Sequence, residues 1–124
     1  MEKEFIPYEQ ALALKELGFN EPCFGWFTIE GDGAKPNFIL STKHKQDIGL
    51  CLAPTYSQAF RWFREKYRIE GISQRAEERE WYKFWIYELY EECKIKISCE
   101  IEFNSYEEAE LACLKKLIEI VKTK

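Results

Sequence analysis

The sequence has very little of the residue types that build metal centres and nucleophilic active sites. Its only histidine, His44, stands between Lys43 and Lys45 in a polar stretch over residues 41–49. A Cys–His nucleophile pair would need a cysteine beside His44 in space, and no motif places one there. No two cysteines form a C-x-x-C pair, which a grouped zinc site would favour. We therefore interpret His44 as a solvated loop residue. We expect no metal, no cofactor and no catalytic residue, and the sequence favours a protein that is not an enzyme.

Phosphate loops and membrane segments are also missing. Gly31-x-Gly33 is too short for a dinucleotide-binding loop and has no helical pattern after it, so it is typical of a turn. No apolar run approaches the length of a transmembrane helix, and the segment MEKEFIPYEQ lacks the apolar core of a signal peptide. We expect no membrane association and a cytoplasmic protein.

Basic charge is not in excess, and the cysteines show no pairing pattern. The formal net charge is −4, which disfavours a protein that lives by binding nucleic acid. The five cysteines are an odd number, and Cys99 and Cys113 fall on apolar faces of their elements. This pattern predicts free thiols in a reducing compartment.

Aromatic residues are dense, at 16% of the chain, and the most informative stretch is Trp81 to Val121. This stretch predicts strand, turn, strand and helix. Alternation over residues 95–103 predicts one apolar and one polar face. A loop of about four residues between the strands sets the register. The expected pairs are Tyr90 with Ile95, Ile86 with Cys99, Phe84 with Ile101, Tyr82 with Phe103, and Lys83 with Glu102.

That register leaves large side chains on the face opposite the core. They are Trp81, Trp85, Tyr87 and Leu89. Either another part of this chain or a second copy covers them, or they form a binding surface for something else. We predict an interaction surface at these positions.

Three amphipathic helices are expected. One begins after Pro7 and ends at Gly18, and one begins at Thr55 with Gln58 completing a capping box. The last begins at Ser105 with Glu108 three residues later. Their apolar stripes are Tyr8, Ala11, Leu12, Leu14 and Leu17; Tyr56, Ala59, Phe60, Phe63 and Tyr67; and Tyr106, Ala109, Cys113, Leu117, Ile120 and Val121.

Two further strands are expected at residues 23–30 and 38–40, with an extended stretch at 50–53. Residues 69–80 are interpreted as a charged connector with a short helical turn at 73–79. The motif [ST]-Y-x-[QE]-A occurs at Thr55 and again at Ser105, which leaves open an old duplication or chance. The prediction is a single α+β domain over residues 1–124, with a four-stranded, mainly antiparallel sheet, helices packed on it, and the order α-ββα-ββα.

The middle helix offers one alternative site. Arg61, Arg64 and Arg68 share a flank, and Trp62 lies off the apolar stripe beside them. Such a flank could hold a phosphate or an acidic partner. Charged helix faces are usually only solvated, so this anion site is the alternative rather than the main prediction.

Several segments of the chain resemble small uncharacterised proteins of phages and prophages of Bacteroidetes-type bacteria. They are FIPYEQALALKELGF, EPCFGW, APTYSQAFRWFREKY and F-x-S-Y-E-E-A-E-L-A-C-L-K-K-L-I-E. The resemblance implies an intracellular accessory role in phage or mobile-element biology and no specific activity. We therefore expect a non-enzymatic interaction protein that binds itself or another protein. The alternative is a nucleic-acid or phosphate-binding protein that uses the arginine flank.

Overall fold

The structure is a computed structural model of the 124-residue chain, and it describes residues 2–28, 36–40, 50–75, 81–89, 93–98 and 102–123. The chain divides into two compact units, Met1–Ser57 and Gln58–Lys124. We call them unit 1 and unit 2 and describe each by itself. The expectation of a single domain stays a prediction.

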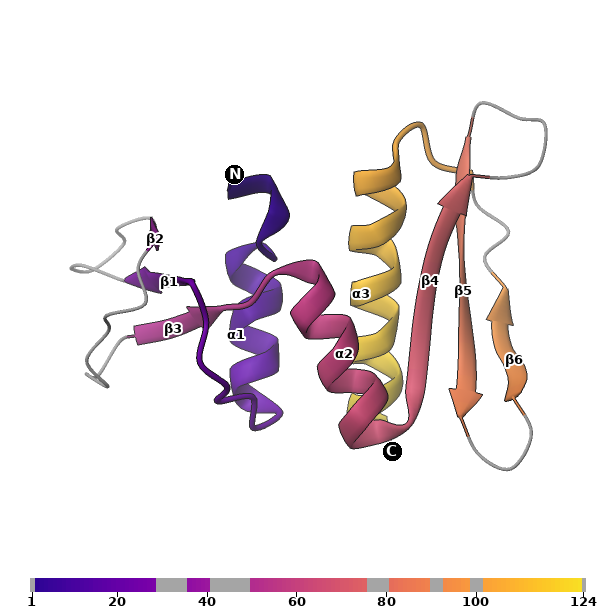
Figure 1. Ribbon diagram of the computed structural model, residues 1–124, viewed down its shortest axis with the longest axis horizontal. Coiled ribbons are helices and arrows are strands. Elements are labelled where there is room, and N and C mark those ends of the chain that lie inside the picture. The colour runs from indigo at the N-terminus through magenta and orange to yellow at the C-terminus, as the bar shows by residue number, and fades with distance from the viewer. Residues whose placement is uncertain are drawn as a thin grey trace. The chain divides into compact units, whose positions relative to one another are not determined.

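Helices and antiparallel strands alternate along the chain, which confirms the α+β class (Figure 1). A short 3-10 turn, Glu2–Glu4, comes first. The helices are α1 (Tyr8–Glu16), α2 (Tyr56–Tyr67) and α3 (Tyr106–Lys122). The strands are β1 (Gly25–Thr28), β2 (Asn37–Leu40), β3 (Leu50–Ala53), β4 (Ile69–Arg75), β5 (Tyr82–Leu89) and β6 (Cys93–Ser98).

The single four-stranded sheet is not confirmed. The described strands form two three-stranded antiparallel sheets, with strand orders β2-β1-β3 and β4-β5-β6. Each sheet has one strand more than the predicted hairpin, because β3 joins the first sheet and β4 joins the second. The prediction that residues 69–80 form a connector is wrong for Ile69–Arg75, because these residues form β4, the second longest of the described strands.

In unit 1 an aromatic cluster joins the amino-terminal segment to the sheet. The ring of Phe27 lies 5.5 Å from the ring of Tyr8 and 5.5 Å from that of Phe38, and Phe5 lies 4.9 Å from Phe38. The Ile6 N–H donates to the Pro54 carbonyl at 3.0 Å. The strand β1 is central in its sheet, as expected of a strand with aromatics on both faces.

The end of α1 follows the sequence prediction. Gly18 has φ 101°, a left-handed conformation that glycine adopts without steric cost. The Phe19 N–H donates to the Leu14 carbonyl at 2.9 Å, and the Gly18 N–H donates to the Lys15 carbonyl at 3.0 Å. These two bonds are the Schellman pattern that ends a helix.

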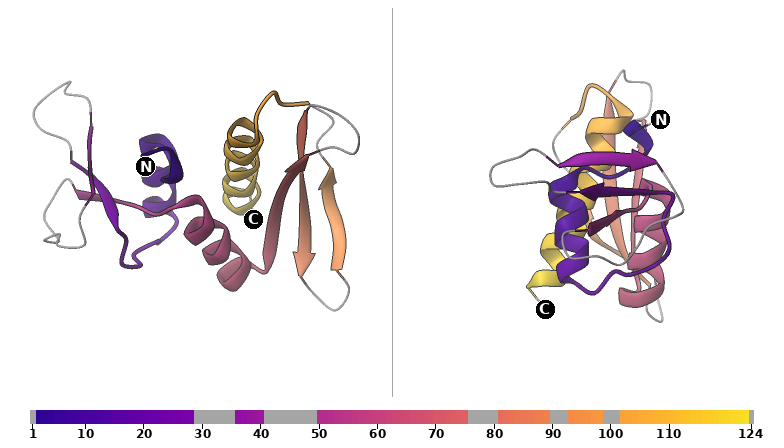
Figure 2. Two further views of the ribbon diagram at one scale, coloured as in Figure 1. Left: turned by 45° about the horizontal axis from the view of Figure 1, so that its top comes forward. Right: turned by 90° about the vertical axis from the view of Figure 1, so that its left-hand side faces the viewer.

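In unit 2 the helix α3 packs on β4 and β5, and the left view in Figure 2 shows it beside the sheet. Its buried residues are Ala109, Cys113, Leu114, Leu117, Ile118, Ile120 and Val121. This confirms the predicted apolar face apart from Tyr106, which is 41% exposed. The helix begins as predicted, because the Ser105 Oγ accepts from the Glu108 N–H at 3.2 Å.

The register of the β5–β6 hairpin is confirmed only at its open end. Tyr82 and Phe103 exchange two backbone hydrogen bonds, of 2.9 and 3.0 Å. Nearer the turn the prediction is wrong, because Ile86 pairs with Ile97 and not with Cys99. The pairing of Tyr90 with Ile95 is also wrong, since Ile95 pairs with Tyr87.

The physical reason is that the register changes along the ladder. Tyr82 and Trp85 are three positions apart in the sequence, whereas their partners Phe103 and Ser98 are five positions apart, so the pairing moves by two residues. The register shifts once more between Ile86 and Tyr87, which no regular alternation would show. The expected pair Phe84–Ile101 lies outside the described residues because Ile101 does. The pair Lys83–Glu102 stays a prediction.

The two sheets do not share a strand order. The first strand of the unit 1 sheet, β1, is central, whereas in unit 2 the second strand, β5, is central. A duplicated ββα unit would be expected to keep one topology. The difference favours chance and shared helix-start chemistry as the origin of the repeated motif.

Candidate interaction surface

One face of the β4-β5-β6 sheet is the core face of unit 2. A Cβ atom on Gly71 would lie 2.5 Å from the Cys113 Sγ and 3.1 Å from the Leu117 Cδ1, so this side of β4 faces α3. Cross-strand partners share a face of a sheet, and Gly71 pairs with Ile86. Ile86 is fully buried and Phe84, two residues earlier, is also buried. The predicted core side of β5 is therefore confirmed.

The opposite side of this sheet is what we call the open face. Its described positions on β4 and β5 are Glu70, Ile72, Gln74, Lys83, Trp85, Tyr87 and Leu89. Ile72 pairs with Trp85 at its centre and is 38% exposed. Among the described residues of unit 2, no helix covers it, because α3 and Phe60 of α2 both lie on the side of Gly71.

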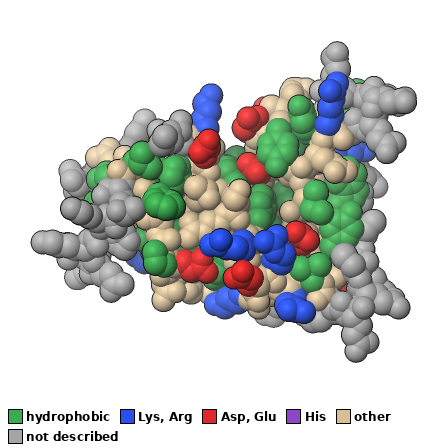
Figure 3. Space-filling model, viewed as in Figure 1, with side chains coloured by type: hydrophobic (Ala, Val, Ile, Leu, Met, Phe, Trp, Pro, Cys, Tyr) green, Lys and Arg blue, Asp and Glu red, His purple; other side chains and the backbone are tan. Residues whose placement is uncertain are grey.

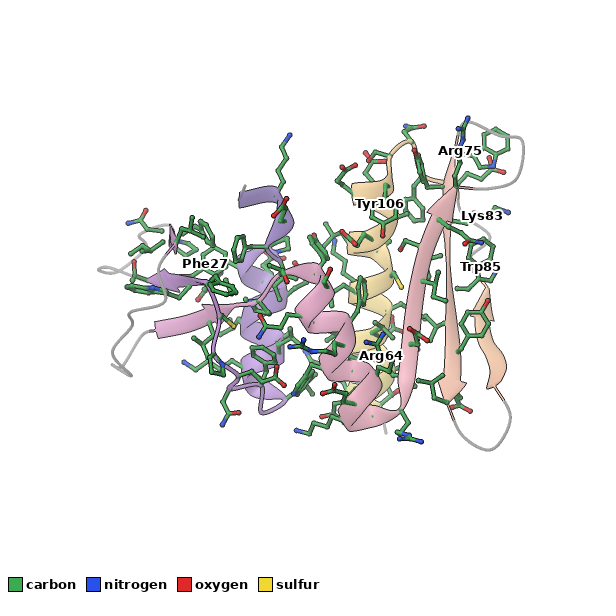
Figure 4. The ribbon with its side chains drawn as sticks, in the orientation of Figure 1. Phe27, Arg64, Arg75, Lys83, Trp85 and Tyr106 are labelled. Carbon is green, nitrogen blue, oxygen red and sulfur yellow. The ribbon has the colours of Figure 1, made fainter. Side chains whose placement is uncertain are left out.

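The open face brings together the sequence-predicted surface residues. Trp85, Tyr87 and Leu89 are partly exposed and follow one side of β5, and Trp81, also partly exposed, precedes the strand. Figure 4 shows Trp85 and Lys83 on the side of the strand turned away from α3. Figure 3 shows hydrophobic side chains at the molecular surface over this sheet.

Sequence reasoning missed the contribution of β4 to this surface. Ile72 and Gln74 were assigned to a charged connector and not to a strand. The signal was weak because the core-facing positions after Ile69 are Gly71 and Ser73, which are small rather than apolar. The strand therefore lacks the alternation that usually marks a half-buried strand.

Charge is placed at the two ends of the open face. Lys83 pairs with Gln74 at one end, and Glu70 pairs with Tyr87 toward the other. The Arg64 Nη1 of α2 donates to the Glu70 Oε1 at 2.9 Å, with side chains that are 43% and 31% exposed. An acid and a base thus flank an apolar centre.

The predicted anion site is only partly assembled. Arg61 and Arg68 are exposed, whereas Arg64 is held by Glu70. Figure 3 shows Lys and Arg side chains beside Asp and Glu side chains over α2 and β4. Arg68 has φ 58°, and its carbonyl accepts from the Leu89 N–H at 2.7 Å, so it forms the turn from α2 into the sheet.

Trp62 is part of the core and not of an exposed flank. It is 6% exposed, and its ring makes edge contacts with Phe63 at 5.1 Å and Tyr67 at 5.4 Å. The Lys66 Nζ lies 5.0 Å from its ring centroid. The prediction that Trp62 lies off the buried stripe is wrong, because its ring is buried and packs against Phe63 and Tyr67. A buried indole cannot stack on a base, which weakens the nucleic-acid alternative.

An acid and a tyrosine meet in the first turns of α3. The Tyr106 hydroxyl donates a hydrogen bond to the Glu110 carboxylate. Burial raises the pKa of Glu110, the hydrogen bond from Tyr106 lowers it, and the charge of Glu107 raises it, with a raised pKa as the result. Burial and the nearby Glu110 raise the pKa of Tyr106. This is an ordinary contact between residues four apart on a helix, and it does not indicate a catalytic reaction.

The thiols are buried where the structure describes them. Cys23, Cys51 and Cys113 are in no disulfide and are at most 4% exposed, and burial raises the pKa of Cys51. Across the described ranges, no three His, Cys, Asp or Glu side chains are grouped to hold a metal ion. The same ranges contain no helix long and apolar enough to cross a membrane. His44 and Cys99 lie outside them.

Comparison with known proteins adds no family to this geometry. No protein-family model, no curated protein sequence and no solved structure matches the chain. Its own residues therefore carry what can be inferred of its function.

Proposed function

We propose that the protein is a non-enzymatic interaction module that binds protein through the open face of its β4-β5-β6 sheet. The observation that carries this is the pairing of Ile72 with Trp85 at the centre of a face that no helix covers among the residues described for unit 2. Trp85 and Tyr87 are its anchors, because large aromatic side chains dominate the binding energy of protein interfaces.

The burial energy that the side chains of the open face can still gain supports a protein interface of ordinary strength. Fully burying one large apolar side chain contributes about 1.5–3 kcal/mol. Ile72, Trp85, Tyr87 and Leu89 are only partly buried, so each has part of that energy still to gain. At its described positions on β4 and β5, the centre of the face carries no charged residue, as is usual for the cores of interfaces.

We place this module in the cytoplasm, as an accessory protein of phage or mobile-element biology. The buried thiols of Cys23, Cys51 and Cys113, none of which is in a disulfide, support a reducing compartment. The resemblance of EPCFGW and APTYSQAFRWFREKY to small phage and prophage proteins supports the accessory role.

A photo-cross-linking amino acid at position 72 tests the proposed function directly. Ile72 is exposed enough to accept it and lies at the centre of the open face. Irradiation in native cells should give protein adducts whose cross-link maps to position 72. Mass spectrometry identifies both the adduct and the cross-linked position.

The matched control carries the same amino acid at Glu119, an exposed position on α3. Adducts at position 72 should disappear when Trp85→Ser is added, and position 119 should give none that depend on Trp85. Equal adducts at both positions, or no protein adduct at position 72, would remove the proposal.

A further inference from the structure

We infer that the protein which covers the open face is a second copy of this chain, packed sheet against sheet with antiparallel strands. The inference rests on the proposed function of the open face and names its partner. The order of charges along that face favours a second copy as the partner.

The open face has three successive levels along β4 and β5. The pair Glu70–Tyr87 is the first level, Ile72–Trp85 the second, and Gln74–Lys83 the third. The acid and the base therefore lie at equal distances, one level each, from the apolar centre. Such a face is complementary to itself when one copy is reversed.

A two-fold axis in the interface, perpendicular to the strands and level with Ile72–Trp85, brings about this reversal. It places Ile72 opposite Ile72 and Trp85 beside Trp85, and it directs Lys83 of each copy toward Glu70 and Tyr87 of the other. Packed sheets lie about 10 Å apart, a distance that side chains from both faces fill.

The other two-fold arrangement, with the axis along the strands, is disfavoured. With the axis between β4 and β5, it brings the two Lys83 side chains to one level, one strand apart, and does the same for the two Glu70 side chains. Like charges brought together across an interface oppose association. The order of charges thus selects the antiparallel arrangement.

Glu70 can serve both Arg64 and the second copy. Arg64 takes its Oε1, and the side chain remains 31% exposed. A carboxylate has two oxygens and can accept several hydrogen bonds. The intramolecular ion pair holds Glu70 in place at the end of the face.

Charge reversal tests the arrangement. Lys83→Glu gives a copy with two acids on the open face. Arg64→Glu/Glu70→Lys gives a copy with two bases and keeps the ion pair in reversed order, so that the fold is protected. Each variant alone should dimerise about tenfold more weakly than the wild type, and an equimolar mixture should form heterodimers at wild-type strength. Native mass spectrometry separates the three species by mass, and circular dichroism checks that each variant is folded.

Three results would overturn the inference: a wild-type monomer at concentrations up to about 1 mM, variants that dimerise as well as the wild type, or a mixture that forms no heterodimer. A monomer whose position 72 still cross-links to a different protein removes the second copy and leaves the proposed function intact. A monomer without such adducts removes both.

Discussion

At Gly71 the absence of a side chain lets α3 lie close against β4. An added Cβ would meet the Cys113 Sγ at 2.5 Å, in a site where Cys113 is fully buried. Gly71→Ala should therefore lower the free energy of unfolding by about 1–3 kcal/mol through overpacking. Urea denaturation followed by circular dichroism measures this.

Removing the obstructing atom provides the control. Cys113→Ala costs stability by itself, but combined with Gly71→Ala it should cost less than the sum of the two, since the two sites touch. Strict additivity would show that Gly71 does not face Cys113.

Arg68 adopts a backbone conformation that suits glycine. Its φ of 58° is the only positive φ among the described non-glycine residues. Arg68→Gly should raise the free energy of unfolding by about 0.5–1 kcal/mol, because relief of the strain exceeds the added entropy of the unfolded chain. The same change at Arg61, within α2, should lower it by about 1 kcal/mol. Two losses of equal size would contradict the left-handed turn.

Glu110 should make stability depend on pH. Its pKa is raised in the folded state, so the folded chain holds this proton more tightly than the unfolded chain does. That contribution is present below the unfolded pKa and is lost as the pH rises through the folded pKa. Glu110→Gln should therefore match the wild type at low pH and exceed it by up to about 0.5 kcal/mol above that window. Thermal unfolding over a pH series measures the difference, and a difference independent of pH would rule out this account.

At the scale of elements, the start of α3 depends on one side chain. The Ser105 Oγ accepts from the Glu108 N–H, while the Glu108 Oε2 accepts from the Asn104 N–H at 3.2 Å. Ser105→Ala should lower the free energy of unfolding by about 1 kcal/mol, and Ser105→Asp should restore most of the loss. Equal losses for both variants, measured by chemical denaturation, would mean that the cap contributes nothing.

Helices were predictable from the sequence, and strand partners only in part. Capping residues and Gly18 set helix ends through local chemistry, so their positions follow from neighbouring residues. The sequence pattern of β4, by contrast, depends on another element. Gly71 is small because Cys113 and Leu117 of α3 lie against it.

Some residues of the candidate surface were likewise predictable from the sequence, and others were not. Trp85 and Tyr87 were predictable because the alternation of β5 puts them opposite Phe84 and Ile86, which are buried. Ile72 was not, since its place depends on recognising β4 as their neighbour. The bulge between Ile86 and Tyr87 has no signal in a regular alternation.

At the scale of the whole molecule, we expect the open face to be buried by association with a second copy of the chain. The most direct measurement is solution mass by light scattering across a concentration series, for the wild type and for Trp85→Ser. The account predicts that the wild type rises from one chain mass toward two with concentration, while the folded variant stays at one. A variant that associates as the wild type does, or a wild type that never exceeds one chain mass, would contradict it.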